Sequence, residues 1–188
     1  MNNKNVLDFF FELGQLKRVR HEGWRFIGVD EPKSVAEHGL RAAQIAFVLA
    51  KMEKYNKPEE ACAMAVFHDM AETRIGDITK IGNRYLKKDE ERAVREQVEK
   101  LGETGKEILE LWKQAEYKST KAGVIAKDAD LLEQAVSAKE YMEKGYKFAE
   151  DWINNISEKL IQTKSAKKLL KDLRKANSNN WWQGLKKF

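Results

Sequence analysis

The chain has 188 residues, of which 42% are hydrophobic, enough for a globular protein with a buried core. Its net charge of +5 suits anionic small molecules and does not by itself indicate a nucleic-acid-binding protein. Cys62 is the only cysteine, which excludes an internal disulfide bond and favours a reducing compartment. No run approaches about 18 apolar residues, and the N-terminus has no cleavage-like site, so we expect a cytoplasmic protein without a membrane span or signal peptide.

The expected secondary structure is helical throughout. The chain contains only two prolines, and no stretch alternates apolar and polar residues long enough to predict a strand. In chain order, the expected helices cover about residues 4–17, 34–50, 58–73, 86–102, 104–117, 120–145, 147–156 and 165–176, and the intervening segments 18–33 and 74–84 are expected to be irregular. The sequence therefore predicts an all-α fold, with one domain over residues 1–188.

Several of these helices have recognisable starts. Ser34 followed by Glu37 forms the pattern of a capping box, and Thr104 followed by Glu107 repeats it. Pro58 suits the first position of the third helix, where its missing N–H costs nothing.

The stretch AVFHDMAETRIGD holds the most informative residues of the chain. A neutral imidazole beside a carboxylate, as in His68–Asp69, is most easily buried when a divalent cation lies between the two groups. Glu72 lies one helical turn after His68 and should project toward the same side. Gly76 and Asp77 follow where the helix should break. These residue types are typical of metal-assisted hydrolysis.

Two further candidate ligands lie far away in the sequence. His38 is near the start of the second expected helix and His68 near the end of the third, and a short turn should make these helices antiparallel, with both imidazoles at the same end. In KDADLLEQA, Asp128 and Asp130 interrupt a helical run although Asp is a poor helix former. Taken alone, His38 could be an ordinary packed histidine, and the two aspartates could complement a helix dipole.

The ordered set His38, His68–Asp69 and Asp130 resembles the HD-domain metal phosphohydrolase superfamily. The strings SVAEH, HDMAE, GD and KDADLLEQA resemble its 5′-deoxynucleotidase family, a set of dimeric all-α enzymes, over about residues 10–145. This resemblance implies a single HD-domain helical bundle. Residues 146–188 would pack on that metal-site core or on a partner subunit. It also implies a homodimer acting on a nucleotide, and neither a membrane nor a nucleic acid is expected as a partner.

The resemblance also implies a role for each motif residue. Four side chains would bind one divalent cation, such as cobalt or manganese: His38, His68, Asp69 and Asp130. Glu72 would orient or deprotonate the attacking water, and Asp77 would act as an acid or contact the sugar. The implied reaction removes phosphate from deoxyribonucleoside 5′-monophosphates. Nitrogen and oxygen ligands without thiolate suit such an ion, which makes a bound water more acidic. Taken alone, Glu72 could be a solvated helix-end residue and Asp77 a turn residue.

The substrate phosphate should need a basic contact, and here the sequence departs from the family pattern. Relatives often carry a proline–arginine pair shortly before Gly-Trp, whereas this chain reads RHEGW, with His21 at the expected arginine. Arg18, Arg20 or a protonated His21 could therefore bind the phosphate. Trp24 could line the sugar pocket or pack on the core. The candidate substrate contacts are Arg18, Arg20, His21, Trp24, Arg25, Arg41 and Lys127.

Other functional classes stay open at this point. The same residues could hydrolyse a phosphodiester or a nucleoside triphosphate, or the metal could be structural in a non-catalytic helical binding protein. A nucleic-acid binder is disfavoured because acidic residues alternate with basic ones in EERAVREQVEK and SAKKLLKDLRK. In the tail, Trp181 and Trp182 are expected to cover the body of the protein or a partner subunit.

Overall fold

The structure is a computed structural model that describes residues 2–156 and 160–186. Over these two ranges the chain forms α-helices joined by short turns and 3-10 helices, without any strand. A single bridge between Arg20 and Ser34 is the only β-type pairing among the same residues. The all-α prediction is therefore confirmed. None of the helices in the described part of the chain is long and apolar enough to span a bilayer.

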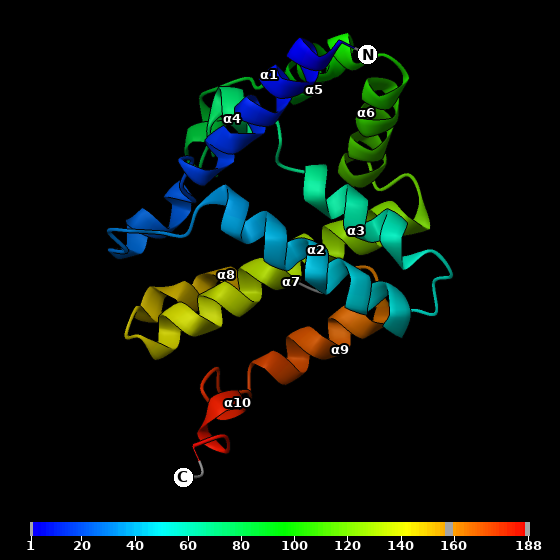
Figure 1. Cartoon of the computed structure of the whole chain (residues 1–188). Coiled ribbons are helices and arrows are strands. Elements are labelled where there is room, and N and C mark those ends of the chain that lie inside the picture. The colour runs from blue at the N-terminus through cyan, green and yellow to red at the C-terminus, as the bar shows by residue number, and fades with distance from the viewer. Residues whose placement is uncertain (1, 157–159, 187–188) are drawn as a thin grey trace.

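Three helices form the centre of the fold (Figure 1): α2 (Val35–Met52), α3 (Pro58–Phe67) and α7 (Lys121–Glu143). Each of them packs against the other two. Their contacting sides are rich in fully buried alanine, and small side chains allow helices to approach closely. These alanines are Ala42, Ala46, Ala50, Ala61, Ala65, Ala122, Ala126 and Ala129. The arrangement brings the start of α2 and the end of α3 together beside the middle of α7.

A second group of helices covers one side of this centre. α6 (Glu103–Glu116) packs on α3 and α7, and α5 (Glu90–Val98) packs on α6. The start of α7 passes very close to the end of α6. A Cβ atom on Gly123 would lie only 2.0 Å from the carbonyl oxygen of Gln114, so only glycine fits at this position. A smaller apolar cluster joins α5 and α6 to α1 (Asn3–Leu13) and includes the buried Phe9, Val94 and Trp112.

The C-terminal helices lie on the other side of α7 (Figure 1). Both α8 (Glu150–Asn155) and α9 (Lys164–Leu173) pack on α7, so this part of the chain covers the central helices. The short α10 (Asn180–Gln183) follows in the tail. Trp181 remains 76% exposed there, so within the described residues it does not cover the body of the protein.

The two expected capping boxes have different outcomes. At α2 the Ser34 hydroxyl accepts a hydrogen bond from the Glu37 backbone N–H at 3.2 Å, and the Glu37 carboxylate accepts one from the Ser34 N–H at 2.6 Å, which confirms the first. The second, at Thr104, is wrong. α6 begins one residue earlier, at Glu103, because Gly102 turns the chain with a φ of +62°.

The helix expected over residues 58–73 ends at Phe67, which corrects that prediction. Trp112 Nε1 donates to the carbonyl oxygen of His68 at 2.9 Å, and the Glu72 N–H bonds instead to the Asp69 carbonyl at 3.0 Å. Residues 68–71 therefore form tight turns before the short α4 (Glu72–Ile75). A side chain from a distant helix thus ends α3 just before the His68–Asp69 pair.

Other helix boundaries differ by a few residues. The first helix ends at Leu13 and continues as a 3-10 helix over Gly14–Lys17. The helix expected from residue 86 begins at Glu90, because the Asp89 carboxylate accepts from the Arg92 N–H and caps it. Within the segments expected to be irregular, 3-10 helices form at Glu22–Ile27 and Gly82–Arg84.

Candidate metal centre

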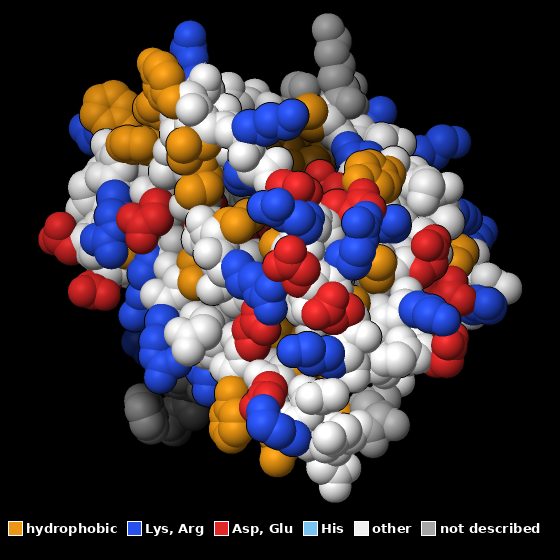
Figure 2. Space-filling view, turned by 90° about the horizontal axis from the view of Figure 1, so that it is seen from above, with side chains coloured by type: hydrophobic (Ala, Val, Ile, Leu, Met, Phe, Trp, Pro, Cys, Tyr) orange, Lys and Arg blue, Asp and Glu red, His pale blue; other side chains and the backbone are white. Residues whose placement is uncertain are grey.

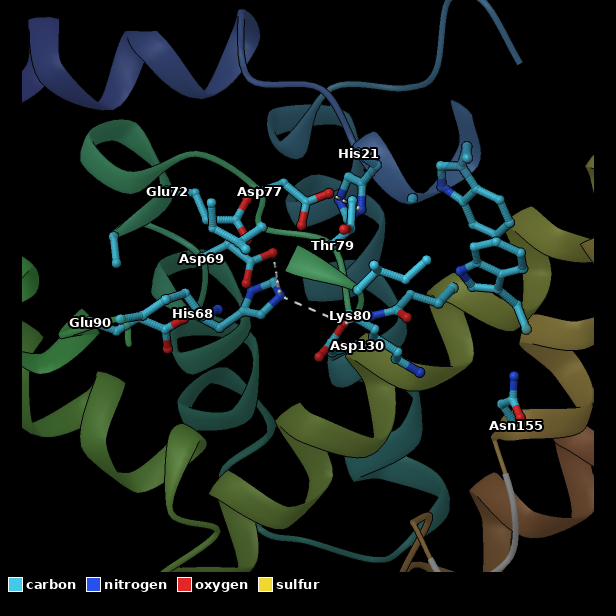
Figure 3. Close-up of a pocket in the computed structure, with 18 of the residues that line it drawn as sticks. His21, His68, Asp69, Glu72, Asp77, Thr79, Lys80, Glu90, Asp130 and Asn155 are labelled. Atoms are coloured by element: carbon cyan, nitrogen blue, oxygen red, sulfur yellow. Dashed lines mark hydrogen bonds and ion pairs between the residues drawn. The ribbon is translucent and has the colours of Figure 1, made fainter. Parts of the chain in front are cut away.

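Four side chains converge where the start of α2 meets the end of α3 and the middle of α7. Figure 3 shows three of them: His68, Asp69 and Asp130. His38 Nε2 lies 3.2 Å from His68 Nε2, 3.2 Å from Asp130 Oδ1 and 3.5 Å from Asp69 Oδ2. His68 Nε2 lies 3.0 Å from Asp69 Oδ2 and 3.8 Å from Asp130 Oδ1. Ligand atoms that share one cation at about 2.1 Å stand about 3 to 4 Å from one another. The two imidazole nitrogens therefore stand at such distances from each other and from both carboxylates.

The charges of this cluster also suit a cation. Burial alone would lower the pKa of His38, but hydrogen bonds with Asp130 and Glu133 raise it to about 10. Burial would raise the pKa of Asp69, but the His68 imidazole holds it well below its usual range. The raised pKa of His38 reflects the carboxylates around its imidazole, and the lowered pKa of Asp69 reflects the imidazoles beside its carboxylate. A divalent cation would neutralise the two carboxylates while leaving both imidazoles uncharged.

Both imidazoles are held so that Nε2 faces the cluster. His38 Nδ1 contacts the Glu133 carboxylate, and His68 Nδ1 donates to the carbonyl oxygen of Ala65 at 2.8 Å. Partners of this kind fix the ring orientation and the tautomer of metal-binding histidines. The donor geometry is therefore set by the protein itself.

Glu133 is a candidate site residue that the sequence reasoning missed. Its side chain is fully buried, and it accepts hydrogen bonds from Lys33 Nζ and, at 2.9 Å, from Arg41 Nε. Ser137 Oγ also bonds to it at 2.9 Å. The spacing of Asp130, Glu133 and Ser137 places all three on one face of α7. These polar residues at helical spacing, within an otherwise apolar helix, are the sequence pattern that could have indicated Glu133 as a site residue.

A cavity of about 520 Å³ opens beside the cluster (Figure 3). His68, Asp69 and Asp130 lie in its wall, while Asn155 lies in a more distant part (Figure 3). Its volume is within the usual range for small-molecule sites, about 300–1,000 Å³. The wall combines ionisable groups with the aromatic side chains of Trp24 and Trp152.

Glu72 and Asp77 both line this cavity. Burial, with Asp69 and Asp77 nearby, raises the pKa of Glu72 to about 9, and its Oε2 atom is buried without a hydrogen-bond partner among the described residues. Asp77 Oδ2 accepts from the Glu22 N–H at 2.8 Å, and burial raises the pKa of its carboxyl. Gly76, with a φ of +72°, allows the turn between α4 and Asp77. Two carboxyl groups therefore stand beside the cluster without belonging to the four converging donors.

The expected basic contacts divide into two groups. Lys127 lines the cavity, with Nζ 3.2 Å from Asp130 Oδ2, whereas none of the four candidate arginines does. Arg20 donates to the Pro32 carbonyl oxygen at 3.3 Å, and Arg18 is exposed. Arg25 donates a hydrogen bond to the Glu22 carboxylate. Arg41 donates to the carboxylates of Glu133 and Glu140.

Two lysines that the sequence reasoning did not select also line the cavity. Lys80 and Lys88 belong to the loop region that follows Asp77. Their position just after the metal-site motif was the only signal for them in the sequence. Together with Lys127 they supply the positive charge around the cavity.

His21 and Trp24 line the cavity as well. Burial, with the positive charges of His38 and Lys33, lowers the pKa of His21 to about 3, which keeps its imidazole neutral. Trp24 is only 2% exposed and stacks on Trp152 with ring centroids 4.6 Å apart. The side chain therefore packs in the core, as one of the two expectations had it, and also lines the cavity. A contact between Trp24 and a sugar stays a prediction.

The model of the HD domain family matches residues 13–173 of this chain. The chain belongs to the HD domain family. The 5′-deoxynucleotidase HDDC2 of Bos taurus is 37% identical over 142 residues, which cover 73% of this chain and 68% of the relative. The protein of the same name from Homo sapiens is 35% identical over 142 residues, covering 73% and 69%. The resemblance expected from the sequence is confirmed.

Solved structures agree with this membership of the HD domain family. A conserved hypothetical protein from Pyrococcus furiosus superposes with a TM-score of 0.76 at 28% identity, covering 90% of this chain and 99% of that chain. A predicted coding region from Archaeoglobus fulgidus gives a TM-score of 0.66 at 28% identity, covering 95% and 99%. The His/Asp cluster of this HD domain could hold a metal ion.

Proposed function

We propose that this HD-domain protein is a metal-dependent phosphomonoesterase that hydrolyses deoxyribonucleoside 5′-monophosphates to deoxynucleosides and phosphate. The observation that carries this proposal is the convergence of four ligand side chains at the wall of a cavity of about 520 Å³. It is supported by curated relatives at 35 to 37% identity that bear the name 5′-deoxynucleotidase.

The residues that would hold the cation are His38, His68, Asp69 and Asp130. When bound, a divalent cation supplies positive charge to the phosphoryl group and makes a neighbouring water more acidic. The protein contributes the fixed orientation of both imidazoles, through Glu133 and the Ala65 carbonyl oxygen. Cobalt or manganese is the expected ion.

Glu72 would accept the proton of the attacking water. A cation held beside Asp69 would supply the positive charge that lowers the pKa of Glu72 from its raised value and leaves its carboxyl ionised for this role. Its carboxyl lines the cavity beside Asp69 without being one of the four converging donors, and its Oε2 atom has no competing partner among the described residues. As the water oxygen bonds to phosphorus, the bond from phosphorus to the 5′ oxygen breaks, and the leaving oxygen receives a proton. Asp77 would supply that proton or contact the sugar.

The remainder of the cavity would bind the nucleotide. Lys80, Lys88 and Lys127 would attract the phosphate, because they are the basic side chains in the wall. Trp24 and Trp152 would offer an aromatic surface to the sugar and base. This division places the charged end of the substrate near the cation and its apolar end farther away.

A nucleotide panel tests the reaction. Purified protein loaded with cobalt or manganese is incubated with deoxyribonucleoside and ribonucleoside 5′-monophosphates, nucleoside triphosphates and a phosphodiester, and phosphate and pyrophosphate are measured. We expect phosphate release that is fastest with deoxyribonucleoside monophosphates and absent in His68→Ala. Pyrophosphate release, or cleavage of the phosphodiester alone, would support the alternative HD-type activities.

The face of the molecule in Figure 2 does not suggest a nucleic-acid-binding function. Figure 2 shows Lys and Arg side chains interspersed with Asp and Glu on the face in view. Nucleic-acid-binding proteins usually gather their basic residues on one face. Binding to DNA or RNA that persists at physiological salt would contradict this interpretation.

We further propose that the protein is a homodimer of a single domain. Large apolar side chains of α2 stay exposed, among them Leu40, Phe47 and Val48, and Trp181 is exposed in the tail. Surfaces of this kind are typical of protein contacts. Light scattering coupled to gel filtration measures the mass directly, and a mass of one chain at micromolar concentration would contradict the dimer. The cytoplasmic location stays a prediction.

A further inference from the structure

His21 places a third imidazole beside the four candidate ligands. Its side chain is only 14% exposed, and the His21 and His38 rings lie 4.6 Å apart, edge to face. One nitrogen of His21 lies within 4.8 Å of donor atoms of His38 and Asp69, so these three side chains form a second possible ligand group. The sequence expectation for this position was an arginine that contacts phosphate.

The hydrogen bonds of His21 leave one nitrogen unused. Its Nε2 atom is buried and has no partner among the described residues. Its Nδ1 atom faces Asp77 Oδ2 at 3.9 Å, across the ring from Nε2. Buried polar atoms in folded proteins almost always have a partner. Because His21 lines the cavity, an ion or molecule bound there is the candidate partner of this nitrogen.

The tautomer favoured by this environment decides which partner fits. A carboxylate beside Nδ1 favours the proton on Nδ1, which leaves a lone pair on Nε2. A lone pair is satisfied by a cation or by a hydrogen-bond donor. A phosphate dianion offers only acceptor oxygens, so it does not satisfy a nitrogen in this state.

We propose that His21 is a fifth protein donor to the cation, which would give the centre three imidazoles and two carboxylates. This inference rests on the metal centre of the proposed function and adds a ligand to it. More nitrogen donors favour cobalt, nickel, copper or zinc over magnesium. The phosphate would then depend on the cavity lysines Lys80, Lys88 and Lys127, because His21 would be committed to the cation.

The test is a titration of the metal-free full-length protein with Co²⁺, followed by its visible absorption, which reports the number and type of ligands. The variants are His21→Ala and His21→Gln, the second of which keeps the polarity and much of the volume. Arg20→Ala is the matched control, since it alters the same loop while the Arg20 side chain contacts the Pro32 carbonyl oxygen outside the cavity. Thermal unfolding of the metal-free proteins shows that each variant is folded.

We expect both His21 variants to bind Co²⁺ at least about tenfold more weakly, the scale on which changes around a metal ligand act, and to show an altered absorption spectrum. The control should match the unmodified protein in affinity and spectrum. Unchanged affinity and spectrum in both His21 variants, with a raised KM for the nucleotide, would overturn the inference and make His21 a phosphate contact. Failure of the unmodified protein to bind Co²⁺ would instead overturn the proposed function.

Discussion

The carboxylate of Glu133 holds Nδ1 of His38 inside the protein and leaves Nε2 of that imidazole facing the candidate metal centre. The same carboxylate accepts hydrogen bonds from Lys33 and Arg41, whose positive charges explain how Glu133 stays ionised although it is fully buried. Burial would raise the pKa of Glu133, but its contacts with His38 and Lys33 hold that pKa far below its usual range. A chain of charges therefore extends from α2 through α7 to the metal ligand.

Replacing Glu133 should weaken metal binding without removing any ligand. In Glu133→Gln the amide can still contact His38, but it no longer carries the charge that stabilises a metal-binding imidazole. We expect the affinity for Co²⁺ to fall about 10- to 100-fold, as measured by competition with a coloured chelator. The control is Glu140→Gln, because Glu140 also pairs with Arg41, at 2.7 Å, and does not contact His38. Equal losses of affinity in both variants would point to a general effect of Arg41.

Much of the centre could be predicted from the sequence because helix geometry is local. The short connection between α2 and α3 requires His38 and His68 to lie at the same end, and the structure places their Nε2 atoms 3.2 Å apart. The Ser34–Glu37 capping box depends only on neighbouring residues, and it is present. The direction of the Arg20 side chain, in contrast, could not be predicted from neighbouring residues. It points to the Pro32 carbonyl oxygen, whose position the local sequence does not determine.

What the sequence could not predict depends on contacts between distant segments. The end of α3 at Phe67 is imposed by the Trp112 indole, which binds the His68 carbonyl oxygen from α6. No glycine or proline lies near position 68 to signal a break in the helix. The role of Glu133 likewise depends on its contact with His38, 95 residues away. Such pairs follow from tertiary packing and are visible only once the helices are assembled.

Glu72 and Asp69 should fail in different ways when they are replaced. Asp69→Ala removes a ligand, so both Co²⁺ binding and phosphate release should be lost. Glu72→Gln keeps the four ligands, so the metal content should stay near that of the unmodified protein while kcat falls about 100- to 10,000-fold, the usual contribution of a general base. Metal analysis and steady-state kinetics on the same samples separate the two effects. A fully active Glu72→Gln enzyme would remove Glu72 from the mechanism.

Acid should weaken the contact that fixes α4, which carries Glu72. Glu12 on α1 accepts a hydrogen bond from Arg74 Nε at 2.5 Å and from Gln97 Nε2 at 3.0 Å. The Arg74 hydrogen bond lowers the pKa of Glu12 below 4.5 in the folded protein. A group with a lowered pKa stabilises the fold above its unfolded-state pKa, and this contribution is lost as the pH falls through the folded-state value.

Urea unfolding of the unmodified protein and of Glu12→Gln should therefore depend on pH in a defined way. At pH 7 the unmodified protein should be the more stable, because its ionised carboxylate pairs with Arg74. The difference in unfolding free energy should shrink as the pH falls from 5 toward 3, since the carboxylate becomes protonated and resembles the amide. A difference that stays constant over this range would show that packing, and not charge, is what the substitution changes.

Trp24 links the stability of the fold to the shape of the cavity. The side chain is 2% exposed, stacks on Trp152 with centroids 4.6 Å apart and lies 4.9 Å from the Tyr141 ring. Trp24→Ala should lower the free energy of unfolding by about 3–5 kcal/mol, the usual cost of truncating a buried aromatic residue. Trp24→Phe keeps an aromatic ring against Trp152 and should lose less. If the nucleotide also contacts this surface, Trp24→Phe should raise KM while leaving Co²⁺ affinity unchanged. A loss below about 1 kcal/mol in Trp24→Ala would contradict a core role for this side chain.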